Sequence, residues 1–491
     1  MSLKSKTTEG VFWSGIFQVV KYILQFVITV ILVRYISPSD FGIIGMVTVF
    51  TELITVFNEM GLTAAIIQKK DINHKALSSM FFLNLGVGLF LTLVTISLSS
   101  LIAQFYKTEI LRVVTIFISF NFILGALAIV QHALFQKELE FKKLAIIDTV
   151  SLILGGSIGI LLAYNGYGVW SLVFKAQAFL FFRVIFLWSI SKFKPSFIFS
   201  WKEIKSYLSF SFEVLGFNII NYLRGNIDYL LVGKFLGATS LGYYTLGFKL
   251  MLYPIKSISS VIIQVLFPAF SIIQDNKSKI RKAYLKVVQS MTFIIYPIML
   301  GLFAVAPEFV LTAYGKQWGP SIFIIRVLCL AGMCCATNAS VVTIYLSTGR
   351  PDIRLKWIMV TTPLTGIAII IGLNWGINGV AVAYSSAELL FWLFSHAIAN
   401  RLIDLKMKDF LSSLVPTFLI SSVMMTVILG FRYIQGSILI LSDFRLLIIS
   451  IILGIFSYLF LMKFFRGKMF DELIGMLTEQ LNFKILKKKE R

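Results

Sequence analysis

Long apolar runs separated by short polar segments repeat along the whole chain. A helix needs roughly 20 predominantly apolar residues to cross the hydrocarbon core of a bilayer, and the apolar runs of this sequence reach that length. The pattern therefore predicts an all-α polytopic membrane protein with about fourteen transmembrane helices. Their approximate limits are 11–33, 41–66, 79–105, 111–135, 144–164, 168–190, 207–233, 243–270, 284–306, 321–346, 355–374, 377–399, 410–431 and 444–462.

Lysine and arginine gather in every second loop between these spans. Such residues accumulate in cytoplasmic loops of membrane proteins. With the N-terminus in the cytoplasm, the loops and termini on that side hold 31 of the 45 basic residues, the opposite loops hold seven, and seven lie within spans. The alternation predicts an even number of spans with both termini in the cytoplasm. It also accounts for most of the net charge of +22 without a nucleic-acid partner.

The second half of the chain is a degenerate copy of the first. A shift of about two hundred positions places Tyr22 on Tyr222, Arg34 on Lys234 and Gly42 on Gly242. A shorter echo relates the segments 166–169 and 376–380, which precede the sixth and twelfth spans. Because both copies begin on the same side of the membrane, the repeats are expected to be parallel.

This repeat predicts the domain organisation. Each half supplies six spans, and the linker between the halves carries Trp and Phe among lysines, which suits a segment on the cytoplasmic surface. The expected parts are an N-lobe (1–190), a lobe linker (191–206), a C-lobe (207–400), two further spans (401–462) and a basic amphipathic cytoplasmic tail (463–491).

Composition excludes a soluble protein and disfavours an enzyme. Hydrophobic residues make up 58% of the chain, charged residues 14%, and the mean hydropathy is +0.87. The run from Val11 lacks a small-residue cleavage site, so it is expected to remain as the first span. No loop exceeds about 25 residues, and the sequence carries none of the common phosphate-binding or hydrolase motifs. Cys329, Cys334 and Cys335 share one apolar segment without metal-ligand spacing. No catalytic residue, metal or cofactor is expected.

Basic residues inside the predicted spans are the main candidates for function. Each costs about 2.5 to 3.5 kcal/mol at a helix centre, so they should line a water-filled space enclosed by protein. Lys249 and Lys256 share a helical face, and Lys21 and Arg224 occupy corresponding spans of the two repeats. The residues expected to form a cationic cavity between the lobes, suited to a diphosphate, are Lys21, Arg224, Lys249, Lys256, Lys175 and Arg183. The alternative for Lys175, Arg183 and Arg326 is snorkelling or neutralisation of buried acids.

Acidic residues in the spans are candidates for coupling transport to H⁺ or Na⁺. Asp228 follows Arg224 by four residues, which favours an intrahelical ion pair over a coupling site. Glu388 and His396 share one span and are candidates for titration in a coupling cycle, although a lone histidine is more often structural. Asp148, near the inner interface, needs no special role.

Several motifs, taken in order, resemble the polysaccharide-exporter branch of the multidrug/oligosaccharidyl-lipid/polysaccharide (MOP) flippase superfamily. The resemblance covers about residues 9–400 and is strongest to O-antigen, colanic-acid and teichuronic-acid translocases. The matching segments are RYISPSDFGIIGMVTVF (34–50), MGLTAAIIQKKD (60–71), GKFLGATSLGYYTLGFKL (233–250), VLFPAFSIIQDN (265–276), YGKQWGP (314–320) and WGINGVAVAY (375–384).

The resemblance implies a two-lobed, MATE-like helix bundle that alternates between inward-open and outward-open states. It also implies the substrate, an undecaprenyl-diphosphate-linked oligosaccharide that is moved to the outer leaflet of the bacterial inner membrane. A polysaccharide polymerase is the expected protein partner, and a monomer is expected because one chain supplies both lobes. The alternatives are a cation-coupled multidrug antiporter of the same superfamily and a membrane polysaccharide polymerase or ligase. An antiporter for cationic drugs favours an acidic cavity, and a polymerase needs a sizeable outer loop.

Overall fold

The structure is a computed structural model that describes residues 3–59, 63, 66, 67, 72–272, 276–438 and 442–489. Regular secondary structure in these residues is helical, as the apolar runs predict. The chain forms two compact units. Unit 1 comprises Met1–Leu246 and Leu355–Val380, and unit 2 comprises Gly247–Arg354 and Ala381–Arg491.

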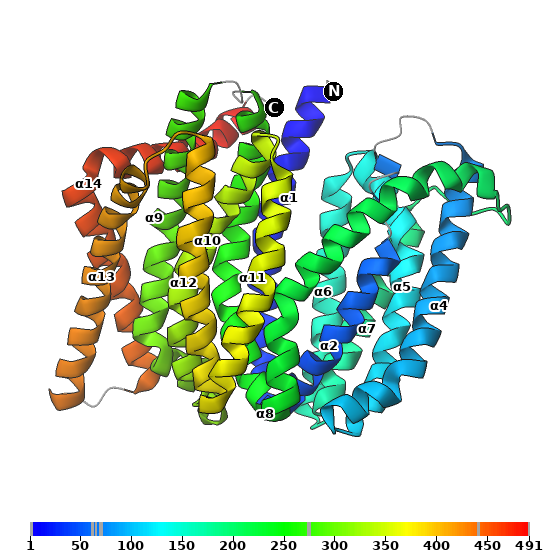
Figure 1. The fold of residues 1–491 in the computed structure, drawn as a ribbon, viewed down its shortest axis with the longest axis horizontal. Helices are drawn as coiled ribbons and strands as arrows, with labels where there is room; N and C mark the ends of the chain where they lie inside the picture. The colour runs from blue at the N-terminus through cyan, green and yellow to red at the C-terminus, as the bar shows by residue number, and fades with distance from the viewer. Residues whose placement is uncertain are drawn as a thin grey trace. The chain divides into compact units, whose positions relative to one another are not determined.

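Unit 1 is a helical bundle in which α4 packs against α5, α6 against α7 and α1 against α6. Within it α4 to α7 lie side by side (Figure 1). Its elements are α1 (Leu3–Tyr35), α2 (Pro38–Glu59), α4 (His74–Tyr106), α5 (Ile110–Lys137), α6 (Phe141–Tyr164), α7 (Val169–Ile190), the part of α8 (Trp201–Ile272) up to Leu246, most of α11 (Pro351–Gly372), η3 (Leu373–Trp375) and the first residues of α12 (Gly376–Leu402).

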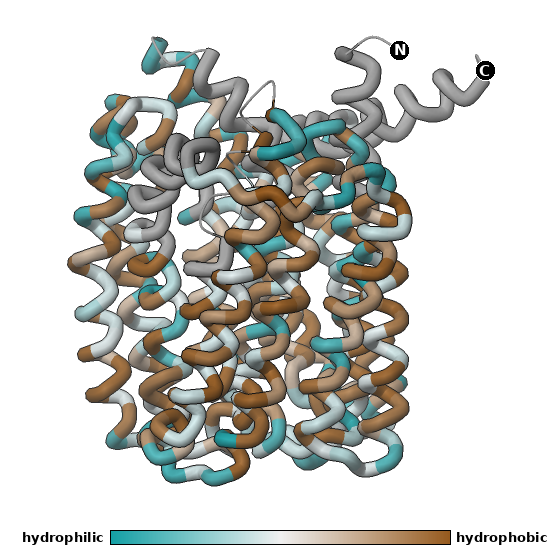
Figure 2. The backbone as a smooth tube through the Cα atoms, turned by 90° about the vertical axis from the view of Figure 1, so that its right-hand side faces the viewer, coloured by the Kyte–Doolittle hydropathy of each residue, from teal (hydrophilic) through white to brown (hydrophobic). Residues whose placement is uncertain are grey.

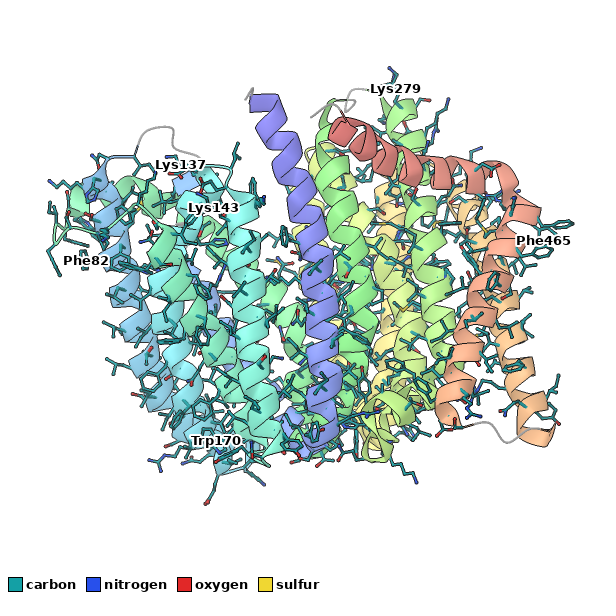
Figure 3. The ribbon with its side chains drawn as sticks, turned by 180° about the vertical axis from the view of Figure 1, so that it is seen from behind. Phe82, Lys137, Lys143, Trp170, Lys279 and Phe465 are labelled. Atoms are coloured by element: carbon teal, nitrogen blue, oxygen red, sulfur yellow. The ribbon has the colours of Figure 1, made fainter. Side chains whose placement is uncertain are left out.

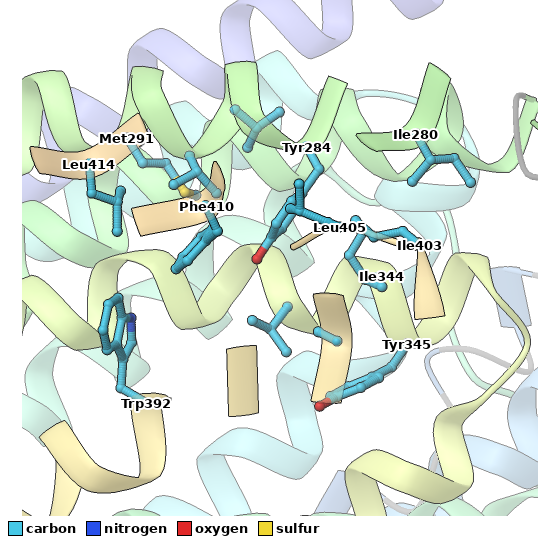
Figure 4. Packing of buried hydrophobic residues seen from close by; sticks show 14 of the residues in the cluster. Ile280, Tyr284, Met291, Ile344, Tyr345, Trp392, Ile403, Leu405, Phe410 and Leu414 are labelled. Carbon is cyan, nitrogen blue, oxygen red and sulfur yellow. The ribbon is translucent and has the colours of Figure 1, made fainter. Parts of the chain in front are cut away.

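Unit 2 is a second helical bundle. It contains the remainder of α8 and α12, together with α9 (Lys277–Phe309), η1 (Val310–Tyr314), η2 (Lys316–Trp318), α10 (Ser321–Ser347), α13 (Met407–Ile438) and α14 (Asp443–Lys489). Tyr284 of α9 stacks on Phe410 of α13 at 6.1 Å between ring centroids, and Trp392 of α12 lies 5.9 Å from Phe410. These rings belong to the core cluster shown in Figure 4.

The last two helices are integral to unit 2. Arg432 of α13 forms an ion pair with Glu308 of α9 at 2.6 Å, and the Glu308 side chain is only 7% exposed. The hydroxyl of Tyr458 in α14 donates a hydrogen bond to the carbonyl of Phe293 in α9 at 2.7 Å. Both helices therefore bind α9 through polar contacts as well as apolar packing.

Ten segments within the described residues are long and apolar enough to cross a membrane. One of them, Pro351–Leu402, contains two of the expected spans, whereas α2 and α8, which hold three more, are not among the ten. The expected number of fourteen is therefore not confirmed, although the multi-pass character is. Figure 2 shows hydrophobic residues along the lengths of the helices and hydrophilic segments near their ends.

A glycine interrupts α8 where the sequence predicts a turn between two spans. Gly237 has φ 80° and ψ 179°, and the residues on both sides are helical. Glycine populates positive φ without the steric penalty that a side chain brings. The break therefore lies within the GKFLGATSLGYY motif and separates the two spans expected at 207–233 and 243–270.

Glycines also allow close helix approach in unit 1. A Cβ at Gly156 of α6 would lie 2.4 Å from Cδ1 of Ile28 in α1, and a Cβ at Gly159 would lie 2.8 Å from Cβ of Lys175 in α7. Small residues permit such contacts between transmembrane helices. They explain why α6 fits between α1 and α7.

A backbone-to-backbone approach joins α2 to α8 and occurs twice. A Cβ at Gly42 would lie 1.7 Å from the carbonyl oxygen of Ala238, and a Cβ at Gly242 would lie 1.8 Å from the carbonyl oxygen of Pro38. The shift of about two hundred positions that relates Gly42 to Gly242 also relates Pro38 to Ala238. Such reciprocity is the signature of a two-fold relation between two copies of one surface.

Candidate functional site

Unit 1 contains a half-open cavity of about 620 Å³ between α2, α5 and α7. We call it the polar cavity, because hydroxyl, amide, imidazole and charged side chains make up half of its lining. These polar residues are Thr48, Thr51, Glu52, Thr55, Thr63, Asn121, His132, Gln136 and Arg183. Within a bundle of apolar helices, so many polar groups around one space indicate a site for water or a polar ligand.

The polarity of the cavity increases along its helices. On α5 and α7 the lining begins with the apolar Ile118 and Leu172 and ends with Gln136 and Arg183. Short connections join α5, α6 and α7, so α5 and α7 run in the same direction. The polar part therefore lies toward the end of unit 1 that carries Lys137, whereas Trp170 marks the opposite end (Figure 3).

An ion cluster stands beside the cavity. Asp148 of α6 accepts hydrogen bonds from Nε of Arg183 at 2.8 Å and from Nζ of Lys21 at 3.4 Å. The side chains of Asp148, Arg183 and Lys21 are 18%, 21% and 34% exposed. Two cations share one carboxylate, so the cluster keeps a formal charge of about +1. Arg183 belongs both to the cluster and to the cavity lining.

Asp148 and His132 are the clearest residues that sequence reasoning missed. No role was predicted for Asp148, but in the structure it forms ion pairs with two of the six predicted cations, Lys21 and Arg183. His132 of α5 lines the cavity and interacts electrostatically with Arg183, Asp148 and Lys21. One signal was available, since Thr48, Thr51, Glu52 and Thr55 recur at helical spacing and form a polar stripe on α2.

The hydroxyls on this stripe present acceptors to the cavity. Thr48, Thr51 and Thr55 donate to the carbonyls of Ile44, Val47 and Thr51, at 2.9, 3.1 and 2.8 Å. A hydroxyl that has given its proton to the backbone keeps its oxygen lone pairs. On the facing α5, Oδ1 of Asn121 is buried, and no described residue donates to it.

The remaining candidates of unit 1 are located on α7 and α8. Lys175 is half-buried on α7, with its stem against Gly159 of α6. Asp228 of α8 is 2% exposed and accepts a hydrogen bond of 2.8 Å from the hydroxyl of Tyr244. Arg224, one turn before Asp228, is half-buried. The Arg224–Asp228 ion pair stays a prediction.

In unit 2 the candidates fall into an exposed pair and a buried pair. Lys249 and Lys256 are exposed on α8. Glu388 of α12 is buried and accepts a weak hydrogen bond from the Cys335 thiol, with 3.9 Å between sulfur and oxygen.

His396 has the surroundings of a packing residue. Its Nδ1 lies 2.9 Å from the Trp392 carbonyl, and since a carbonyl can only accept, Nδ1 carries the proton. The ring is fully buried, 4.9 Å from the Trp392 ring and 4.7 Å from the Phe410 ring. Across the described part of the chain, no three His, Cys, Asp or Glu side chains gather in a way that could hold a metal.

The segment of the chain that contains the helices of the polar cavity matches a known protein family. The sequence profile of the family described as polysaccharide biosynthesis protein matches residues 31–323, which is more than half of the chain. The protein belongs to this family. The matched range includes α2, α5 and α7, as well as Asp148 and Arg183.

Individual family relatives cover most of the chain. The chain is 29% identical over 408 residues to the lipopolysaccharide biosynthesis protein WzxC of Escherichia coli (strain K12). The alignment covers 81% of this chain and 82% of WzxC. It is 25% identical over 464 residues to the teichuronic acid biosynthesis protein TuaB of Bacillus subtilis (strain 168), covering 94% and 96% of the two chains.

A solved structure confirms the fold class. The lipid II flippase MurJ, in an inward closed conformation, aligns with a TM-score of 0.73 over 94% of this chain and 98% of its own. The sequence identity is 19%, so this likeness concerns the fold alone. The all-α polytopic fold predicted from the sequence is thereby confirmed.

Proposed function

We propose that this protein is a flippase, a transporter and not an enzyme. Its substrate is an undecaprenyl-diphosphate-linked oligosaccharide, which it moves from the cytoplasmic to the outer leaflet of the bacterial inner membrane by alternating access. Membership of the polysaccharide biosynthesis family supports this, as do the names of the WzxC and TuaB relatives. The observation that carries the proposal is the polar cavity with its ion cluster, located within a bundle of mostly membrane-spanning helices. A polar space inside the bundle lets the polar head group of a lipid cross the membrane without entering the hydrocarbon, where burial of polar groups is costly.

In this proposal the cations bind the diphosphate. Lys21 and Arg183 hold more positive charge than Asp148 neutralises, and an arginine fork suits phosphate oxygens. Lys175, Arg224, Lys249 and Lys256 supply further contacts during the transition. Asp228 and Glu388 are the acids available for coupling to H⁺ or Na⁺. The basic end of unit 1, which carries Lys137, faces the cytoplasm, in line with the distribution of charge among the loops.

The second candidate function is a cation-coupled multidrug antiporter. The observation that favours it is Glu52, a carboxylate on the wall of the polar cavity that would suit a cationic drug. The two functions differ in what accumulates when the protein is missing.

The deciding experiment is mass spectrometry of polyprenyl-linked lipids from cells that lack the protein, combined with an assay of the leaflet that holds them. A flippase defect leaves an oligosaccharide diphospholipid on the cytoplasmic face, and its mass gives the sugar repeat. Normal lipid levels together with drug sensitivity would instead establish the antiporter. Repeat units that accumulate on the outer face would mean that flipping is intact and that polymerisation has failed.

A further inference from the structure

We propose that the polar cavity of unit 1 binds the sugar part of the substrate and selects for it, while the diphosphate stays beside the cavity at the ion cluster. This assignment rests on the proposed flippase function. It places the two parts of the flippase substrate, the sugar and the diphosphate, at two neighbouring sites of unit 1. It makes Thr51, Asn121 and Glu52 specificity-determining residues.

The first argument is the hydrogen-bonding character of the lining. The hydroxyls of Thr48, Thr51 and Thr55 donate to the backbone, and so they offer acceptors to a ligand. The buried Oδ1 of Asn121 lacks a donor among the described residues, and a buried acceptor without a donor is unfavourable. Sugar hydroxyls supply donors on all sides, whereas an ionised diphosphate supplies only acceptors.

The second argument is charge. The lining contains one carboxylate, Glu52, and one guanidinium, Arg183, and Asp148 binds that guanidinium at 2.8 Å. The lining and Asp148 together therefore offer a diphosphate no surplus of formal positive charge. Lys21 is not part of the lining but lies on the same carboxylate, Asp148. An anion at the ion cluster thus meets two cations, while an uncharged sugar in the cavity meets no repulsion.

The third argument is size. The volume of about 620 Å³ falls within the range of roughly 300–1,000 Å³ that is typical of small-molecule sites. The apolar part of the lining, which includes Ile118 and Leu172, lies toward the end away from Lys137. A sugar head that enters from the basic end therefore fills the cavity while its diphosphate remains near Arg183.

The test compares two probes on the purified full-length protein in nanodiscs. One probe is undecaprenyl diphosphate, and the other is the lipid-linked oligosaccharide purified from cells that lack the protein. The ratio of their dissociation constants measures the contribution of the sugar. The variants are Thr51→Val and Asn121→Leu, which are close in size to the native residues and remove polar atoms, and Glu52→Gln, which removes only the charge.

The matched control is Thr149→Val on α6. Its hydroxyl donates to the carbonyl of Ala145, four residues earlier, at 2.7 Å, as Thr51 does to Val47 at 3.1 Å, but Thr149 does not line the cavity. A structural effect of removing a threonine hydroxyl from a helix should appear in both variants. Loss of a sugar contact should appear only in Thr51→Val.

The expected result is that Thr51→Val and Asn121→Leu each reduce the preference for the glycosylated lipid by about three- to tenfold, the range that one hydrogen bond supplies. Their affinity for undecaprenyl diphosphate, like both affinities of Thr149→Val, should stay at the native value. An equal loss of affinity for both probes would overturn the assignment and make the cavity a diphosphate site. An unchanged preference in both variants would also overturn it.

Two further outcomes separate this inference from the proposed function. If Glu52→Gln abolishes movement driven by a proton or sodium gradient and leaves the sugar preference intact, the cavity serves coupling and the sugar assignment is wrong. If the native protein neither binds nor moves the glycosylated lipid, the flippase function fails and the assignment falls with it. If the native protein moves the glycosylated lipid and the cavity variants keep the native sugar preference, the sugar assignment alone fails.

Discussion

Replacing Gly42 with alanine should push apart two helices of unit 1 that now meet backbone to backbone. The added Cβ would lie 1.7 Å from the carbonyl oxygen of Ala238, whereas ordinary van der Waals contact begins at 3.4 Å. The obstacle is a backbone carbonyl, which cannot swing aside as a flexible side chain does. The helices must therefore separate locally by about the 1.7 Å difference between these values.

The cost of this separation should exceed the gain in helix propensity. Overpacking a tight contact costs typically about 1–3 kcal/mol, and a gap of even 0.5–1 Å forfeits roughly a quarter to a half of the dispersion energy of the atoms it separates. Alanine regains about 1 kcal/mol over glycine in a helix. Because the required shift is larger than such a gap, we expect Gly42→Ala to destabilise the protein by about 2 kcal/mol net.

The assay is thermal unfolding in detergent, followed by intrinsic fluorescence. Gly86→Ala is the matched control, since a Cβ at Gly86 of α4 meets no atom within 4 Å, and it should be neutral or slightly stabilising. Gly242→Ala, with its Cβ 1.8 Å from the Pro38 carbonyl, should resemble Gly42→Ala. The double variant should cost less than the sum, because the first substitution already opens the shared contact. A Gly42→Ala protein that melts like Gly86→Ala would refute the reasoning.

Three other experiments test the ion pairs and the predicted cations. Asp148→Asn should lower stability by about 1–2 kcal/mol, since two partly exposed cations lose their shared carboxylate, and chemical denaturation would measure the loss. Arg432→Ala should cost about 3–5 kcal/mol by leaving Glu308 buried without its cation, and a second change, Glu308→Ala, should restore part of the melting temperature. Arg224→Ala combined with Lys249→Ala should abolish export without loss of membrane insertion, and normal export in those cells would contradict the cationic binding role.

Local features of the fold were predictable from the sequence. The apolar runs mark where most of the helices lie, although α9 and α14 extend well beyond the predicted spans. The break at Gly237 follows from a glycine-rich motif between two such runs. The register of the repeat was predictable for the same reason, because Gly42 and Gly242 stand in matching motifs. These properties depend on short stretches of chain, and short stretches are what a sequence displays directly.

The partners of the charged residues were not predictable. Asp148 lies 127 residues from Lys21 and 35 from Arg183, and the pairing depends on how α1, α6 and α7 are rotated about their axes. That rotation is set by packing details such as Ile28 against Gly156, which hydrophobic periodicity does not encode. For the same reason, the cost of burying charge predicted that Lys21 and Arg183 need a polar environment, but not that one carboxylate serves both.

The helix that supplies the threonine wall of the cavity, α2, also contacts α8. Gly42 near the start of α2 touches Ala238, next to the break at Gly237. Further along α2, the hydroxyl of Tyr222 in α8 donates to the carbonyl of Val49 at 2.6 Å, within the stripe that presents Thr51 to the cavity. These two contacts, about two helical turns apart on α2, constrain both its position and its rotation. A movement of this part of α8 would therefore act on the threonine wall, so the geometry of the polar cavity depends on α8, although none of the described α8 residues is among its lining.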